Sequence, residues 1–427
     1  MARVAHLGLW SSIALVVANM IGAGVFTSSG YALAGLGARH YVMWAWAVGG
    51  ILALCGAVSY AGLAARMPES GGEYHYLEQT VHPIAGFLAG WVSLLAGFTA
   101  PIALAAVTLQ EYLGPVFGLG ADRHWVATGA ILTAFGMHAV RRPGIILQNL
   151  AVLLKLLLLV AFLVIAAVEI PQRTEVEKVA TAVPFDLGAF AVSLVYISLA
   201  YSGWNATVYI AGEVRDAKRN ATRSLWMGCG VVCLVYLALN YVFLYGAPIA
   251  EIRGQAAIGA IAAAALGGET FERLVRLAVA VALFTSISSM VMIGPRVYAK
   301  MAEDGLFPRV FASGGDVPLA AVALQAIGAI AIAGVTDVKT VLEYIGFTLG
   351  ISSAVTVLGL ILLRRRLGRT AVPVFGYPLV PLVYIVVTLG AAGYLAVSKE
   401  HGALWGTVTV LAGLPLYFVF RRRPLRT

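Results

Sequence analysis

Two groups of helix-weak residues interrupt apolar stretches of this chain, and their backbone groups could bind a small charged molecule. Gly22-Ala23-Gly24 lies in the first apolar stretch, and Ser202-Gly203 lies in the sixth. Each break falls near the middle of a membrane-spanning length. Lipid cannot satisfy unpaired backbone groups there, so the broken segments must be buried in protein or line a cavity. Breaks at corresponding places in two halves of a membrane protein are typical of a transport site.

The first break offers partial charges of both signs. A half-helix that ends near Ile21 presents carbonyl oxygens with partial negative charge, and a half-helix that begins near Val25 presents free amides with partial positive charge. A carboxylate would sit on the amides of residues 23–25. An ammonium would sit on the carbonyls at residues 20–21 and 199–201. The pattern therefore predicts a site for a zwitterion, and close helix packing is the alternative role of such small residues.

One basic residue lies deep in the fifth apolar stretch. Lys155 is flanked on each side by two leucines. A lysine at the centre of a membrane span costs about 2.5–3.5 kcal/mol on insertion scales, and this one is too deep for its ammonium to reach the interface. A residue retained at that cost indicates a coupling or gating function. A structural lysine bonded to backbone carbonyls is the alternative.

The composition places these residues in a membrane protein. Of the 427 residues, 60% are hydrophobic and 11% are charged, whereas a soluble domain carries about 25% charge. A spanning helix needs about 20 apolar residues, and the sequence holds twelve candidates. They are residues 8–35, 42–64, 84–112, 125–139, 145–168, 187–212, 225–247, 274–299, 318–335, 339–363, 377–397 and 402–420. We expect residues 1–427 to form a single polytopic, all-α membrane domain, because no gap is long enough for a soluble domain.

The basic residues predict the orientation of the chain. With the N-terminus inside, 19 of the Lys and Arg residues fall on the inner side and 9 on the outer side. Lys and Arg concentrate in cytoplasmic loops, so we expect both termini in the cytoplasm. The net charge of +9 then mostly reflects topology. The basic residues form no single face, which argues against a nucleic-acid partner.

The sequence carries none of the common catalytic or metal-binding motifs. It has no His-Glu-x-x-His, no Gly-x-Ser-x-Gly and no cysteine cluster of metal-ligand spacing. The three cysteines, Cys55, Cys229 and Cys233, all fall inside predicted spans. We therefore expect no enzyme activity, catalytic residue, cofactor or metal. A channel would need a continuous polar lining, which these apolar spans lack.

Four segments resemble the amino acid–polyamine–organocation (APC) transporter superfamily. Residues 18–26 are similar to its first-span signature, and residues 68–74 (Pro-Glu-Ser-Gly-Gly-Glu-Tyr) to its first cytoplasmic loop. Residues 296–299 and 304–308 are similar to the end of its eighth span. Residues 200–205 look most like the L-type amino acid transporter branch. These motifs occur in the family's order and on the corresponding spans.

The resemblance implies a fold and an organisation. Members of this family adopt the LeuT-type fold, in which two inverted repeats of five helices each contain one broken helix, here helices 1 and 6. The first repeat would cover about 8–168 and the second about 187–363. The helices at about 377–420 would be an addition to this core.

The resemblance also implies roles for individual residues. Lys155 matches a lysine that, in sodium-independent relatives, occupies the region where sodium-coupled members bind an ion. Its ammonium would bridge the first break and a hydroxyl of the eighth span, with Ser286 as first choice and Ser289 as second. Bonding of these hydroxyls to their own helix is the alternative. The implied substrate-binding residues are Ile21, Gly22, Ala23, Gly24, Val25, Leu199, Ala200, Ser202, Gly203 and Trp204. Leu199 stands where the family often has an aromatic gate, which leaves the substrate's size open.

The charges of the spans favour a neutral substrate. No Asp or Glu lies in the middle of spans 1, 3, 6, 8 or 10, so a cationic side chain would lack a counter-ion. Apart from Lys155, no central cation awaits an acidic side chain. We expect a sodium-independent secondary transporter of neutral L-amino acids in the cell membrane, working by exchange, with proton symport as the alternative. Residues 113–124 contain no cysteine, so a disulfide-linked partner subunit is not expected.

Overall fold

The computed structural model describes most of the chain. It covers residues 7–69, 71–118, 124–139, 144–169, 183–312, 319–335, 337–398 and 401–420, and for residues 139 and 144–152 it describes the backbone alone. Several charges that enter the topology prediction, among them Arg3, Arg141 and Arg421, lie outside the described residues.

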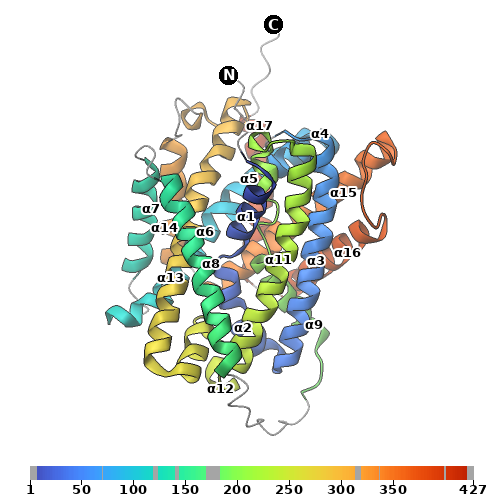
Figure 1. The fold of residues 1–427 in the computed structure, drawn as a ribbon. Helices are drawn as coiled ribbons and strands as arrows, with labels where there is room; N and C mark the ends of the chain where they lie inside the picture. Colours follow the sequence, from blue (N-terminus) through green and yellow to red (C-terminus); the bar gives the residue numbers. More distant parts are fainter. Residues whose placement is uncertain are drawn as a thin grey trace.

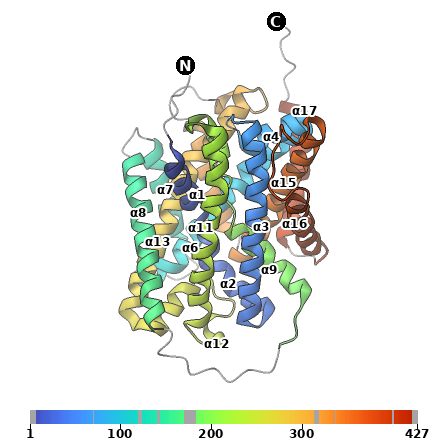
Figure 2. The same cartoon turned by 45° about the vertical axis from the view of Figure 1, so that its right-hand side comes forward.

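The described helices run alongside one another in one bundle (Figures 1 and 2). Among the described residues, seven helical segments are long and apolar enough to cross a membrane, and the bent pair α1 and α2 makes an eighth span if taken together. The seven are Arg39–Arg66 (α3), Pro83–Phe117 (α5, η1, α6 and η2), Ala217–Tyr245 (α11), Ile258–Glu303 (α13), Val338–Leu367 (α15), Leu379–Val397 (α16) and His401–Phe420 (α17). The protein is a multi-pass membrane protein. The full set of twelve spans and the repeat boundaries stay predictions.

The remaining expected spans also fall on helices. They correspond to α7 (Trp125–Ala139), α8 (Gly144–Glu169), α9 (Leu187–Ala200) and α14 (Leu319–Val335). Short helices cap the two ends of the bundle, with α4 (Gly72–Thr80) at one end and α12 (Ile249–Ile252) at the other (Figure 1). We call these the α4 end and the α12 end. Under the topology prediction, the α4 end is cytoplasmic.

The first apolar span is broken where its glycines fall. Helix α1 (Leu9–Met20) stops, and α2 (Ala23–Leu36) begins after a bend of 42°. Gly22 precedes α2 in an extended conformation and has no side chain to cap the helix. The first amides of α2 therefore lack a side-chain acceptor, and they point out of the helix with its positive dipole end.

The sixth apolar span is broken as well. Helix α9 stops at Ala200, and the chain turns through residues 201–205 before the short helix α10 (Ala206–Tyr209). Gly203 has a φ of +98°, a conformation that a residue with a side chain rarely adopts. A single turn, η4 (Ala211–Glu213), follows. The half of this span at the α4 end is therefore short and irregular.

Helix α13 is longer than hydropathy predicted, because two helices join at Gly268, where φ is +70°. The part before this kink packs with α12 at the α12 end. The chain between them closes over α2: the amide of Gly254 donates to the carbonyl of Gly30 at 2.8 Å, and Arg253 donates to that of Ala34 at 3.1 Å. A Cβ at Gly30 would lie 2.0 Å from the carbonyl oxygen of Gln255, so this close approach requires glycine.

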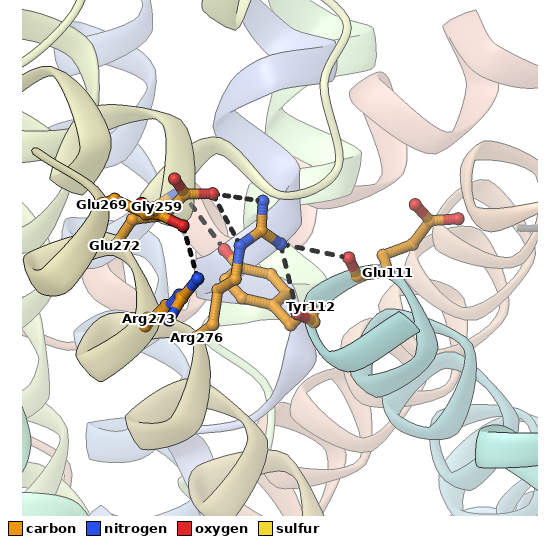
Figure 3. Close-up of polar contacts among 7 residues, drawn as sticks. All are labelled: Glu111, Tyr112, Gly259, Glu269, Glu272, Arg273 and Arg276. Atoms are coloured by element: carbon orange, nitrogen blue, oxygen red, sulfur yellow. Dashed lines mark hydrogen bonds and ion pairs between the residues drawn. The ribbon is translucent and has the colours of Figure 1, made fainter. Parts of the chain in front are cut away.

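A polar cluster fixes three helices at the same end (Figure 3). Arg276 of α13 donates to the carbonyl of Tyr112, at the C-terminus of α6 (Ala100–Leu113), at 3.1 Å and pairs with Glu272 at 2.7 Å. The hydroxyl of Tyr112 donates to the carbonyl of Phe26 in α2 and accepts from the amide of Gly259, both at 3.2 Å. A guanidinium at a helix C-terminus is favourable both as a hydrogen-bond donor and as a charge. The cluster joins α2, α6 and α13.

Candidate functional site

The two helix breaks pack directly against each other in the centre of the bundle. A Cβ on Gly24 would lie 2.5 Å from the Cα of Ala200. The side-chain amide of Asn19 donates to the carbonyl of Gly203 at 3.2 Å, and a Cβ on Gly203 would lie 2.8 Å from that amide nitrogen. Only glycine allows the backbones to approach this closely. The sequence predicted two breaks, and the structure brings them into contact.

A tyrosine of α11 links the ends of the two interrupted helices. The hydroxyl of Tyr236 lies 2.5 Å from the carbonyl oxygen of Met20 and 3.1 Å from that of Ala200, so its single proton is shared between the two acceptors. Its ring packs against Trp46 and Tyr201, with centroids 5.5 and 5.1 Å apart. Tyr236 thus holds the last carbonyls of α1 and α9 at a fixed spacing. These carbonyls lie in the segments predicted to face an ammonium.

Lys155 reaches the first break from α8. Its side chain is 1% exposed, and Nζ donates to the carbonyls of Ala18 at 3.1 Å and Ile21 at 2.9 Å. The hydroxyl of Ser286 in α13 donates to the same Ile21 carbonyl at 3.1 Å and to Ala282 of its own helix at 3.1 Å. Lys155 and Ser286 therefore meet at the end of α1, where the ammonium balances the negative end of the helix dipole. Ser289, the second choice from sequence, is half-buried further along α13.

A cavity opens beside the second break. It holds about 1010 Å³ of empty space, its open mouth included. From the sequence-predicted set, Leu199, Ser202, Gly203 and Trp204 line it, whereas Ala200 and residues 21–25 are buried and do not line it. The other described lining residues are Asn19, Gly49, Leu52, Ala53, Glu73, Gly97, Phe98, Pro101, Ser198, Tyr201, Asn205, Tyr209, Met290, Gly346, Leu349, Gly350, Ser353, Tyr384 and Thr388.

The charges in this lining are few. Among the described residues that line the cavity there is no Lys or Arg, and the single carboxylate is Glu73 from α4. The sequence placed Glu73 in a loop motif and gave it no function. Its carboxylate accepts hydrogen bonds from Tyr60, Asn205 and Tyr209. The cavity therefore suits a ligand with no net side-chain charge.

Comparison with known proteins settles the family. A family profile described as amino acid permease matches residues 7–420. The chain belongs to the amino acid permease family. The membership of the APC superfamily that the four motifs indicated is thereby confirmed, and the protein is an amino acid transporter by family.

Individual relatives are distant but cover almost the whole chain. Asc-type amino acid transporter 1 of Mus musculus is 26% identical over 435 residues, which cover 97% of this chain and 81% of the relative. The large neutral amino acids transporter small subunit 2 of Homo sapiens is also 26% identical, with coverage of 97% and 80%. The serine/threonine exchanger SteT of Bacillus subtilis is 25% identical, with coverage of 98% and 97%.

Sequence reasoning missed two residues that join the breaks. Asn19 lies within the first-span motif, but nothing in the motif shows that its amide reaches Gly203. Tyr236 lies one helical turn after Cys233 in an apolar span, where an isolated tyrosine resembles ordinary packing. The signal in both cases was a hydrogen-bonding side chain placed in the middle of a span, where its polar atoms need partners.

We expect Tyr236→Phe to raise the KM for the transported amino acid about tenfold. The substitution keeps the buried ring and removes the hydroxyl from the Met20 and Ala200 carbonyls. Each net hydrogen bond contributes about 0.5–1.5 kcal/mol, and about 1.4 kcal/mol corresponds to a tenfold change in affinity. Uptake kinetics in proteoliposomes check this. Tyr241→Phe is the control, since that side chain is 48% exposed on the same helix; equal KM values in the two variants would contradict the prediction.

Proposed function

We propose that this permease carries neutral L-amino acids across the cell membrane by alternating access, without sodium and in exchange for another amino acid. The proposal rests on the contact between the two helix breaks beside a cavity in the middle of the bundle, and on the start of α2, which has no side-chain cap. A zwitterion needs amides for its carboxylate and carbonyls for its ammonium, and the two breaks supply both at one place.

The binding mode follows from this arrangement. The substrate carboxylate binds the amides at residues 23–25, and the ammonium binds the carbonyls at residues 20–21 and 199–201. In this structure the carbonyl of Ile21 is bonded to Lys155 and Ser286, and those of Met20 and Ala200 to Tyr236, so the substrate ammonium shares these acceptors or displaces the donors. Residues 21–25 are buried and do not line the cavity in this structure, so this binding mode requires a movement that exposes the first break to the cavity. Leu199 and Trp204 then contact the substrate side chain.

The cavity supports a neutral side chain. With no Lys or Arg in the described lining, an acidic side chain has no counter-ion. A basic side chain could pair with Glu73 only by displacing its three hydrogen-bond donors, and those donors would then lack an acceptor. The names of two relatives specify large neutral amino acids and serine or threonine, and both classes lack side-chain charge.

Sodium independence is proposed from Lys155. Its ammonium is bonded to two carbonyls at the end of α1, which is where a bound cation would gain the same stabilisation. The proposal also includes the five-plus-five inverted repeats, both termini in the cytoplasm, and no disulfide-linked partner subunit.

Uptake into proteoliposomes tests the proposed function. We expect radiolabelled uptake to saturate, to be accelerated by an amino acid loaded inside, and to proceed equally in sodium and potassium buffers. A competition panel of the twenty amino acids, with and without a pH gradient, identifies the substrate. Acceleration by the pH gradient with no effect of internal amino acid would favour proton symport. Strict dependence on sodium would contradict the function given to Lys155.

A further inference from the structure

Glu73 is a buried carboxylate at an unusual place. It lies in the first turn of α4, and its side chain is 6% exposed. It also lines the cavity, on the side formed by Asn205 and Tyr209. A buried carboxylate is costly unless it is well hydrogen-bonded. The hydrogen-bond partners of Glu73 therefore indicate which elements this carboxylate holds together.

Those partners come from two other elements. Oε1 accepts from the hydroxyl of Tyr60 in α3 at 3.0 Å and from the side-chain amide of Asn205 at 2.7 Å. Oε2 accepts from the hydroxyl of Tyr209. Asn205 and Tyr209 both belong to the second half of the broken sixth span. Hydrogen bonds to an ionised group are about twice as strong as those between neutral groups.

The second half of this span cannot hold its position by itself. Helix α10 has four residues and is followed by a single turn, η4. Isolated helices shorter than about 12 residues are marginal in water, so the position of this half depends on contacts with its neighbours. Two such contacts lie next to Glu73: a Cβ on Gly72 would lie 2.2 Å from the ring of Tyr209, and that ring packs on Phe98 with centroids 6.0 Å apart.

We propose that Glu73 is the positioning residue that fixes the second half of span 6 against α4 and so closes the α4 end of the cavity. We name Tyr60, Glu73, Asn205 and Tyr209 the inner latch. The proposal rests on the proposed function, because closing a cavity at one end matters only in a carrier. Opening the cavity at this end requires residues 203–213 to move away from α4, and the latch opposes that movement.

Two substitutions remove the same bond of the latch. Glu73→Gln keeps the shape of the side chain and one oxygen, but its amide nitrogen cannot accept from the hydroxyl of Tyr209. Tyr209→Phe removes that hydroxyl and keeps the ring against Gly72 and Phe98. Controls are Glu78→Gln, which changes a half-exposed glutamate of the same helix, and Tyr241→Phe, which changes an exposed tyrosine of α11.

Hydrogen–deuterium exchange of the purified protein tests the latch without any transport assay. We expect amides of residues 203–213 to exchange about tenfold faster in Glu73→Gln and in Tyr209→Phe, and those of residues 187–199 to be unchanged. The double variant should exchange more slowly than the product of the two single effects predicts, because both changes act on the bond between Glu73 and Tyr209. Unchanged exchange at residues 203–213, a uniform rise along the chain, or additive effects would each overturn the proposal.

Transport supplies the second readout. In proteoliposomes we expect both single variants to lower the maximal uptake rate about tenfold and to change the equilibrium affinity less than about twofold, since Glu73 contacts the second break at Asn205 and not at the carbonyls of residues 199–201. If the wild-type protein transports amino acids and both variants transport them at the same rate and affinity, the latch is contradicted and the proposed function is not. No amino acid transport by the wild-type protein would contradict the proposed function, while the exchange measurement would still decide whether the latch exists.

Discussion

Lys155→Ala is expected to reduce amino acid uptake at least about tenfold while the protein stays folded. The ammonium makes two hydrogen bonds to carbonyls at the end of α1, and each bond from a charged donor is worth about 1.5–3 kcal/mol. Without it, the Ala18 and Ile21 carbonyls lose their cation, and the end of α1 is no longer tied to α8. The Ser286 hydroxyl, which shares the Ile21 carbonyl, cannot replace a positive charge.

Folding of the variant is expected because the change removes a buried charge and adds none. Replacement of buried charged groups by apolar residues of similar volume is often neutral for stability; alanine is smaller than lysine, so we expect a folded protein with a lower midpoint of thermal unfolding. Gel filtration and the midpoint of thermal unfolding check this, and uptake in proteoliposomes checks the transport defect. Lys218→Ala is the matched control, since Lys218 is exposed near the start of α11. Full uptake by Lys155→Ala would show that the residue is a structural lysine.

Gly24→Ala is expected to abolish uptake although it adds a single methyl group. The new Cβ would lie 2.5 Å from Cα, 2.8 Å from Cβ and 3.0 Å from N of Ala200. These atoms belong to the backbone of Ala200 or, in the case of Cβ, are bonded directly to it, so no side-chain rotation can relieve the clash. In a helix, Ala is favoured over Gly by about 1 kcal/mol. A loss of uptake in Gly24→Ala must therefore come from the clash between the two breaks and not from a lower helix propensity.

Gly35→Ala in the same helix separates the two effects. There the nearest atom is the Cβ of Ala189, at 4.0 Å, so the substitution gains the same propensity without a clash. We expect Gly35→Ala to transport like wild type. Uptake at the wild-type rate by Gly24→Ala would mean that the close approach of the two breaks is not needed in the transport cycle.

The positions of the breaks could be predicted because they depend on local chemistry. Gly22 and Gly24 are weak helix formers at the middle of a 28-residue apolar stretch, residues 8–35, and the structure interrupts the helix between Met20 and Ala23. The sixth span behaves in the same way at Ser202 and Gly203. Hydropathy likewise located each expected span on a helix, because a buried or lipid-facing helix must be apolar along its length.

The partners of the breaks could not be predicted, because they depend on which side chains reach them in three dimensions. Tyr236 and Glu73 are more than 150 residues apart in sequence, and both bond to the sixth span. Hydropathy assigned Glu73 to a loop and did not show that α4 inserts it into the cavity wall. It also missed the first part of α13, since the kink at Gly268 separates that part from the apolar run.

The most decisive experiment is a structure of this permease with its amino acid bound. The proposed binding mode places the carboxylate within about 3 Å of amide nitrogens at residues 23–25. It places the ammonium at the carbonyls of residues 20–21 and 199–201. An amino acid bound in the cavity with neither charged group touching either break would contradict it.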